Sequence, residues 1–232
     1  RDNLPAMSEH MTTPERTVEV VQWLVAVCGW DGVAAAMLGQ AFNIPVVITS
    51  RGTDINLIPQ YATPRRQILW AADKAAGMIT VCQALKDSLI ELGADAAKIH
   101  ALRNGVDLDM FQPTNRADAR KSLGLASRTL LSVGHLIERK GHDLAVSALP
   151  ALPDTALLIA GDGPERQNLE ALASRLGVTD RVTFLGRIPH DQLASVYTAA
   201  DALILASSRE GWANVLLEAM ACGTPVIASN VW

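Results

Sequence analysis

Two glutamates, Glu210 and Glu218, lie eight residues apart near the end of the 232-residue chain. Glu210 follows an apolar run at 202–206, whereas Glu218 is the only charged residue in the sequence Val-Leu-Leu-Glu-Ala-Met-Ala-Cys. Burying a carboxylate without a partner costs several kcal/mol, so we expect a partner for Glu218 inside the fold. Two carboxylates at this spacing can each bind hydroxyl groups of a nucleotide sugar. The alternative is structural: Glu210 is solvated, and Glu218 pairs with a lysine or arginine or caps another helix.

The segment between the two glutamates adds a candidate site for an anion. Gly211 lies in a turn before a predicted helix at 214–222, and the first backbone N–H groups of a helix have no partner within it. Together with the helix dipole, these groups favour the binding of a phosphate. The candidate binding residues here are Gly211, Ala213, Asn214, Val215 and Leu216.

Apolar runs alternate with helical patterns along the chain, which predicts βαβ units and a parallel sheet. We predict strands at 45–49, 78–82, 98–102, 129–133, 156–160, 181–185, 202–206 and 225–229. We predict helices at 31–42, 63–76, 83–92, 141–149, 164–176, 190–200 and 214–222, the second with Thr63 as N-cap and Pro64 at its first position. The polar stretch 104–128 interrupts this alternation and predicts a domain boundary.

Polar loops follow four of the predicted strands in the second half, at 134–140, 161–164, 186–189 and 207–213. In a parallel sheet these loops gather at the carboxyl edge, where open α/β sheets bind ligands. Gly-Asp-Gly-Pro at 161–164 is either a tight turn or bare backbone that a nucleobase can approach. Lys140 is either a solvated charge or a cation for a diphosphate. The further candidates at this edge are Gly134, His135, Arg139, Gly161, Gly163, Gly186, Arg187 and Ile188.

Composition excludes several classes of protein. The net charge of −4 and the pI of about 5.7 argue against a nucleic-acid partner. The three cysteines, Cys28, Cys82 and Cys222, are far apart and lack metal-ligand spacing, which indicates a reducing, cytoplasmic location. No run reaches the ~20 apolar residues that a membrane-spanning helix needs, and the apolar segment 18–27 predicts a strand or a buried helix.

Several of these motifs, in their order along the chain, resemble the GT4-type (group 1) retaining glycosyltransferases of the GT-B fold. The similar segments are Asn-Gly-Val-Asp at 104–107, Ser-Val-Gly-His-Leu-Ile-Glu-Arg-Lys-Gly at 132–141, Ala-Gly-Asp-Gly-Pro at 160–164, and Glu-x7-Glu running into Glu-Ala-Met-Ala-Cys-Gly-Thr-Pro at 218–225. Each segment is weak alone, and the ordered set is specific. The resemblance covers about residues 40–232.

The resemblance implies an α/β protein with two Rossmann-like, doubly wound parallel-sheet domains. They would be a partial N-terminal acceptor-side domain at 1–108, a linker at 109–128, and a C-terminal donor-binding domain at 129–232. The N-terminal domain is expected to be incomplete, and the chain to be truncated at both ends. The full-length protein could also associate peripherally with a membrane.

The resemblance also implies a reaction. A hexose moves from a UDP- or GDP-sugar to a hydroxyl of a glycan, lipid or small-molecule acceptor, with retention and with no metal ion or cofactor. It places Glu210 on the transferred sugar, Glu218 on the ribose and Lys140 on the diphosphate. Backbone groups of 211–216 would bind the donor, and 186–188 would lie by the base.

Two departures from the family pattern leave alternatives open. His135 stands where arginine is common, so diphosphate binding weakens or Arg139 substitutes. Arg51 stands where histidine is usual, and Asp54 either orients a hydroxyl or pairs with Arg51. The other histidines, at 10, 100, 142 and 190, are expected to be surface or capping residues. The alternative functions are a nucleotide-sugar 2-epimerase of the same fold class and a non-catalytic nucleotide-sugar-binding fragment.

Overall fold

The computed structural model describes residues 30–231, and the predicted segment 18–27 lies outside them. The chain divides into two compact units, with the division between Asn104 and Gly105. Each unit is built on a parallel sheet with helices, which confirms the predicted α/β class.

The first unit holds a parallel sheet in the order β1-β2-β3. Its strands are β1 (Val47–Ser50), β2 (Gly77–Thr80) and β3 (Ile99–Ala101), and its helices are α3 (Trp30–Phe42), α4 (Thr53–Asn56), α5 (Ala62–Lys74) and α6 (Gln83–Glu91). The predicted N-cap at Thr63 is wrong, because α5 begins at Ala62 with Tyr61 as its N-cap. Pro64 is tolerated in this first turn because N–H groups there have no partner within the helix.

The second unit holds a five-stranded sheet in the order β6-β5-β4-β7-β8, and all of its paired strands are parallel. The strands are β4 (Arg128–Val133), β5 (Thr155–Ala160), β6 (Val182–Gly186), β7 (Ala202–Leu205) and β8 (Val226–Ala228). The chain starts at β4, adds β5 and β6 on one side, and then returns to add β7 and β8 on the other. The strand order therefore reverses between β4 and β7, which is the topological switch point of a doubly wound sheet.

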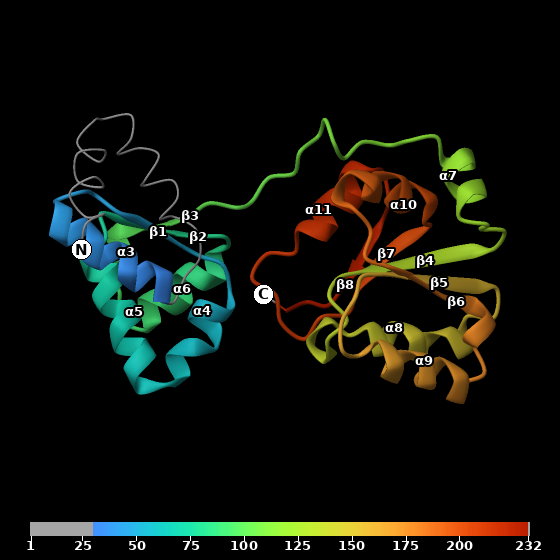
Figure 1. Ribbon diagram of the computed structural model, residues 1–232, viewed down its shortest axis with the longest axis horizontal. Coiled ribbons are helices and arrows are strands. Elements are labelled where there is room, and N and C mark those ends of the chain that lie inside the picture. Colours follow the sequence, from blue (N-terminus) through green and yellow to red (C-terminus); the bar gives the residue numbers. More distant parts are fainter. Residues whose placement is uncertain (1–29, 232) are drawn as a thin grey trace, which may run out of the picture. The chain divides into compact units, whose positions relative to one another are not determined.

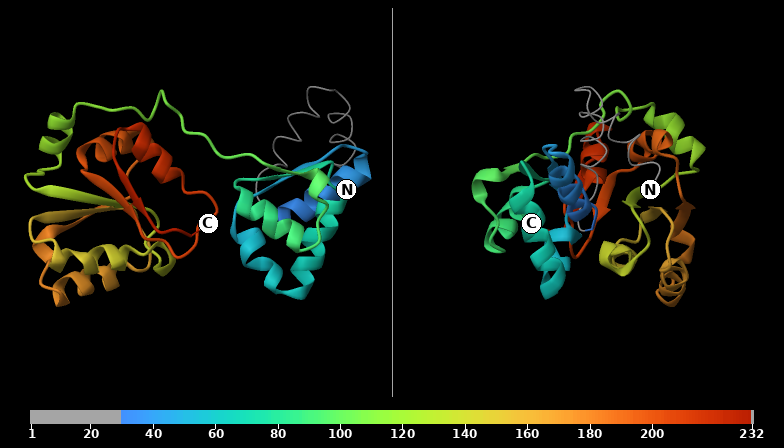
Figure 2. Two further views of the ribbon diagram at one scale, coloured as in Figure 1. Left: turned by 180° about the vertical axis from the view of Figure 1, so that it is seen from behind. Right: turned by 60° about the vertical axis from the view of Figure 1, so that its left-hand side comes forward.

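Helices cover both faces of this second sheet (Figure 1), and Figure 2 shows the same layers from behind. The helices α8 (His142–Ala148) and α9 (Arg166–Arg175) lie on one face, and α10 (Leu193–Ala199) and α11 (Asn214–Ala221) lie on the other. Strand β5 shows why two layers are needed. Leu157 and Ile159 pack in the core with α8 and α9, whereas Leu158 and Ala160 pack in the core with α10 and α11. An apolar strand buried on both sides is typical of a central parallel strand.

Two predicted helices start later than expected. The chain at 164–165 forms a turn before α9, and residues 190–192 form a 3-10 turn before α10. Pro189 lies directly before the 3-10 turn, and α10 begins after that turn, at Leu193.

The segment predicted as a linker, 109–128, folds onto the second unit. Phe111 is buried in the core beneath α10, and α7 (Arg116–Ser122) packs against α10. Asn115 caps α7 by accepting hydrogen bonds from the backbone N–H groups of residues 117 and 118. Arg116 and Arg120 both form ion pairs with Asp201, which also accepts a hydrogen bond from the Thr129 N–H. The charged residues of this segment therefore form ion pairs within the second unit, to which the segment belongs.

Candidate functional site

The two side chains predicted to do the chemistry meet at the switch point of the second sheet. Lys140 lies in the loop after β4, and Glu210 lies in the loop after β7. The Lys140 ammonium donates a hydrogen bond of 2.6 Å to Oε1 of Glu210. The Ser207 hydroxyl donates a second bond of 2.6 Å to the same oxygen. Both charged side chains are largely shielded from solvent, with 18% and 15% of their surfaces exposed.

Backbone contacts hold these two loops together. The Ser208 N–H donates to the carbonyl of Arg139, and the Arg139 guanidinium donates to the carbonyl of Arg209, both at 2.9 Å. Gly141 adopts φ 66°, and a Cβ atom there would collide with the carbonyl of Ala206. The close approach of the loops therefore requires glycine at this position and fixes Lys140 opposite Glu210. Arg139 is the predicted substitute cation for His135, but its guanidinium donates a hydrogen bond to the neighbouring loop.

A pocket of about 390 Å³ opens at the carboxyl ends of β4, β5 and β6. Five predicted binding residues line it: Gly134, His135, Gly161, Arg187 and Ile188. Its wall is completed by four residues that were not among the predicted binding residues: Val133, Ala160, Asp162 and Leu193. A Cβ atom on Gly161 would collide with the carbonyl of Gly134, so the two turns pack backbone to backbone. The two glycines thus contribute bare main chain to one part of the pocket wall.

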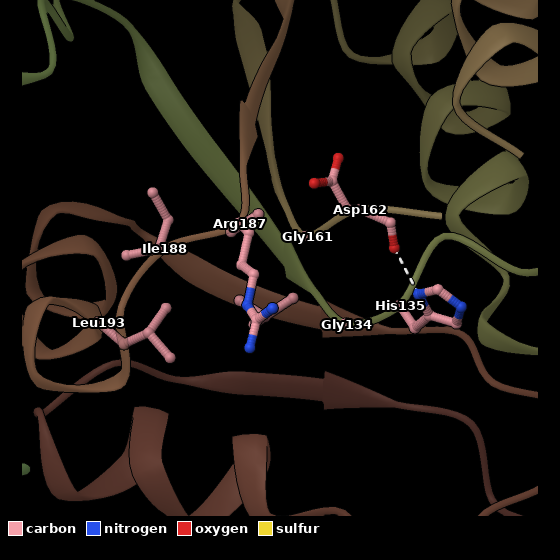
Figure 3. A pocket seen from close by; sticks show the side chains of 9 residues that line it. Gly134, His135, Gly161, Asp162, Arg187, Ile188 and Leu193 are labelled. Atoms are coloured by element: carbon pink, nitrogen blue, oxygen red, sulfur yellow. Dashed lines mark hydrogen bonds between the residues drawn. The ribbon is translucent and has the colours of Figure 1, made fainter. Parts of the chain in front are cut away.

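Two side chains of this pocket differ in whether their N–H groups already have a partner (Figure 3). The Nδ1 atom of His135 lies 2.5 Å from the backbone oxygen of Asp162, so its N–H is used by the neighbouring turn. The Arg187 side chain extends into the pocket between Ile188 and Leu193 on one side and His135 and Asp162 on the other. Arg187 is exposed, and it is the arginine that lines this pocket. It is therefore well placed to meet an anionic ligand.

Glu218 has two partners of its own, a buried tyrosine on α10 and an exposed histidine at the turn before it. The Tyr197 hydroxyl donates a 2.7 Å hydrogen bond to Oε2 of Glu218, and Nε2 of His190 lies 3.3 Å from Oε1. The predicted need for a partner is met, but by a phenol and an imidazole and not by lysine, arginine or a helix end. His190 is accordingly more than an ordinary surface residue.

The remaining predicted residues take supporting positions. Helix α11 begins at Asn214 after the N-cap Ala213, so Gly211 to Leu216 span its first turn and the loop before it. Gly163 has φ 159° and packs against the backbone of Leu136. Gly186 accepts a 2.7 Å hydrogen bond from the Gly161 N–H through its carbonyl.

In the first unit, Asp54 is 5% exposed and accepts hydrogen bonds from backbone N–H groups. The donors are Gly52 at 2.6 Å and Arg51 at 3.1 Å. Its observed contact with Arg51 therefore runs through the main chain of that residue. The carboxylate holds the turn that opens α4.

His142 was predicted as a surface or capping residue, and this is wrong. It is 2% exposed, and Nδ1 lies 2.8 Å from the hydroxyl of Ser132 on β4. Burial lowers the pKa of His142; the backbone of His135 opposes this shift, and the nearby charge of Lys140 adds to it. Its Nε2 atom and the stem of Lys140 both lie close to Gly134. No spacing in the sequence indicates this role.

A second hollow of about 490 Å³ is lined by residues of the same two loops and by the start of α8. Its walls combine two arginines with two acidic residues and one exposed leucine: Glu138, Arg139, Gly141, Asp143, Leu144, Ala206, Ser208 and Arg209. Within residues 30–231, no group of three or more His, Cys, Asp or Glu side chains is placed to hold a metal ion. No helix in that same range combines the length and apolar character needed to cross a membrane.

A doubly wound parallel sheet with a pocket and an acid–cation pair beside its switch point is typical of nucleotide-binding α/β proteins. Comparison with known families makes the assignment specific. Residues 115–232 match the family described as Glycosyl transferases group 1, and residues 20–110 match Glycosyltransferase Family 4. The chain belongs to the group 1, GT4-type glycosyltransferases, as the motifs predicted.

Individual relatives agree with this assignment. The D-inositol 3-phosphate glycosyltransferase of Mycobacterium sp. (strain KMS) is 35% identical over 223 residues, which cover 90% of this chain and 50% of that protein. The enzyme of the same name from Mycobacterium tuberculosis (strain ATCC 25177 / H37Ra) is 40% identical over 147 residues, which cover 60% of this chain and 30% of that protein. The chain thus spans about half the length of the first of these relatives.

Solved structures show the GT-B fold. Sucrose-phosphate synthase from Thermosynechococcus elongatus has a TM-score of 0.78 at 31% identity, covering 88% of this chain and 55% of that structure. Anabaena HepE in complex with UDP and glucose has a TM-score of 0.79 at 24% identity, covering 94% of this chain and 63% of that structure. The predicted fold class is confirmed.

Proposed function

We propose that this chain belongs to a retaining glycosyltransferase that moves a hexose from a UDP- or GDP-sugar to a hydroxyl of a glycan, lipid or small-molecule acceptor. The observation that carries the proposal is the 2.6 Å contact between Lys140 and Glu210 at the switch point. A cation and a carboxylate side by side suit the two halves of a sugar diphosphate. The diphosphate attracts the ammonium, and the sugar hydroxyls donate to the carboxylate.

Each group at the edge has a distinct task in this proposal. Lys140 and backbone N–H groups at 211–215 bind the diphosphate, with the dipole of α11 in support. The predicted Leu216 N–H is not among these donors, because it bonds to the Ala213 carbonyl at 3.1 Å. Glu210 binds hydroxyls of the transferred sugar, and Glu218 binds the ribose. The pocket lined by Gly161, Arg187 and Ile188 takes the remaining nucleotide.

The chemistry rests on stabilising the leaving group. The bond between the anomeric carbon and the diphosphate oxygen breaks, and the negative charge that develops on that oxygen is stabilised by Lys140 and the backbone donors. The acceptor oxygen bonds to the anomeric carbon on the face that the diphosphate leaves. The acceptor proton passes to the departing phosphate oxygen, so retention needs no protein nucleophile.

The relatives suggest where to begin with substrates. Two of them are named for D-inositol 3-phosphate, and a protein of the same fold, HepE, was solved with UDP and glucose. We therefore take a UDP-hexose as the first donor and a polyol phosphate as the first acceptor.

The test is a turnover assay with UDP- and GDP-hexoses, each with and without acceptor. The expected result is acceptor-dependent release of nucleoside diphosphate and a product whose anomeric configuration, read by NMR, matches that of the donor. A sugar converted without acceptor would instead indicate a 2-epimerase. Binding of the donor without release by this chain or by its full-length protein would indicate a non-catalytic role.

A further inference from the structure

Glu218 is held by a buried hydroxyl that has no other evident purpose. Tyr197 is 0% exposed, and its hydroxyl donates to Oε2 of Glu218 at 2.7 Å. Burial, and next the hydrogen bond to Glu218, raise the pKa of Tyr197 far above its usual range. The phenol therefore stays protonated, and its proton points at the carboxylate.

The second oxygen of Glu218 is flanked by an imidazole at the surface. Nε2 of His190 lies 3.3 Å from Oε1, while 62% of the His190 side chain is exposed. Phe111 packs edge-on against both rings, with its centroid 4.9 Å from that of His190 and 6.1 Å from that of Tyr197. One aromatic side chain from the segment before α7 thus braces both groups that hold the carboxylate.

This cluster adjoins the pocket at the carboxyl edge. Leu193 lines the pocket and lies one helical turn before Tyr197 on α10, so the two side chains share a face of that helix. His190 follows the pocket residues Arg187 and Ile188 by two to three positions. The Glu218 side chain is 10% exposed and is therefore nearly, but not fully, enclosed.

We propose that Tyr197 is a positioning residue that aims the Glu218 carboxylate at the ribose of the donor nucleotide, with His190 as the second support. This inference rests on the proposed function, which places Glu218 on the ribose. The arithmetic of hydrogen bonds favours it. An ionised carboxylate has about four acceptor positions, and Tyr197 and His190 use one on each oxygen. One position remains on each oxygen, which matches the two vicinal hydroxyls of a ribose.

Holding the carboxylate in advance also has an energetic consequence. A free glutamate side chain loses rotamer freedom when it binds a ligand, and this cost weakens binding. With Tyr197 and His190 in place, that freedom is already lost in the folded protein. If the hydrogen bond between Tyr197 and Glu218 were purely structural, its removal would lower the stability of the fold. It would then affect ligands with and without ribose hydroxyls equally.

The experiment measures affinity by calorimetry for three probes: UDP, 2′,3′-dideoxy-UDP and inorganic pyrophosphate. Tyr197→Phe removes the hydroxyl and keeps the ring against Phe111. We expect the affinity for UDP to fall about tenfold and the affinities for the other two probes to stay within about twofold. Tyr61→Phe is the matched control, because Tyr61 is the other tyrosine of the chain and is 66% exposed. It should leave all three affinities unchanged.

Glu218→Ala separates this inference from the function on which it rests. If Glu218→Ala leaves the preference for UDP over the dideoxy nucleotide intact, the assignment of Glu218 to the ribose fails. If Glu218→Ala abolishes the preference but Tyr197→Phe preserves it, Tyr197 does not position the carboxylate. In the double variant, Tyr197→Phe should cause no loss beyond that of Glu218→Ala.

A surface variant keeps the inference testable should the buried substitution impair folding. His190→Gln changes a largely exposed side chain and keeps a donor in place of the imidazole, whereas His190→Ala removes the donor. We expect His190→Ala to lower UDP affinity about threefold, without effect on pyrophosphate, and His190→Gln to restore most of the loss. Equal losses for all three probes in both His190 variants would overturn the inference.

Discussion

Lys140 and Glu210 neutralise each other across 2.6 Å, although they lie seventy residues apart in the chain. In the proposed donor complex, a diphosphate would compete with Glu210 for the Lys140 ammonium, and the sugar hydroxyls would replace the contact that Glu210 loses. The ion pair would then link binding of the two halves of the donor, because the anion and the sugar would act on opposite members of one pair.

The first prediction concerns the acidic member of this pair. Glu210→Gln removes the charge that competes for Lys140, so UDP should bind as well as before or up to about threefold more tightly. Turnover should fall by about ten- to a hundredfold, because a charged hydrogen bond to the sugar is worth about 1.5 to 3 kcal/mol. Calorimetry with UDP and a steady-state assay measure the two effects. A parallel fall in UDP affinity and turnover would contradict the assignment of Glu210 to the transferred sugar.

The second prediction concerns the cation. Lys140→Ala should weaken binding of both the donor and UDP about tenfold at low salt, and by less at high salt, because ions screen the lost attraction. Lys121→Ala, which removes an exposed lysine from α7 of the same unit, is the control for net charge. Identical UDP affinities in the two variants at low salt would contradict the proposal that Lys140 binds the diphosphate.

Much of the second unit could be predicted from the sequence, since its strands are short apolar runs between glycine- and proline-rich turns. Leu157 to Ala160 shows the reason: a short run that is apolar at every position is typical of a strand covered on both faces. The gathering of Gly134, Gly161 and Arg187 into one pocket also followed from their places after parallel strands.

Contacts that depend on how helices pack could not be predicted in the same way. Sequence reasoning required a partner for Glu218, yet Tyr197 becomes that partner only when α10 and α11 pack side by side on the sheet. Phe111 and α7 lie in a segment whose many charges do not indicate a helix packed on the core. Two of its arginines form ion pairs with Asp201, a residue that is distant in the sequence. The Asn115 cap was the available local signal.

The third prediction tests the exposed guanidinium in the pocket. Arg187→Ala should lower UDP affinity about fivefold near 50 mM salt, and the loss should shrink as salt rises. Arg187→Lys should restore part of the affinity, because it keeps the charge and loses the planar fork. His135→Gln should have a smaller effect, since Nδ1 of His135 already bonds to the Asp162 carbonyl. Equal affinity for UDP in the wild type and Arg187→Ala would remove Arg187 from the donor site.

The last prediction follows from the buried histidine behind the Lys140 loop. Burial lowers the pKa of His142 from its ordinary value of 6.5, so the unfolded chain binds a proton at a higher pH than the folded one does. As pH falls through 6.5, protonation therefore favours the unfolded state, and the free energy of unfolding should drop by at most about 1.4 kcal/mol per pH unit. Above that range His142 is neutral in both states and adds no pH dependence.

Urea unfolding of the second unit at several pH values between 5 and 8 measures this slope. His142→Gln should flatten the acid side of the curve, although it lowers stability at neutral pH by disturbing the contact with Ser132. His100→Gln, which changes an exposed histidine, should leave the slope as it is in the wild type. Because Nε2 of His142 lies close to Gly134, acid should also loosen the loop at 134–140 before the unit unfolds. If the acid-side slope of His142→Gln equals that of the wild type, His142 is not the source of that slope.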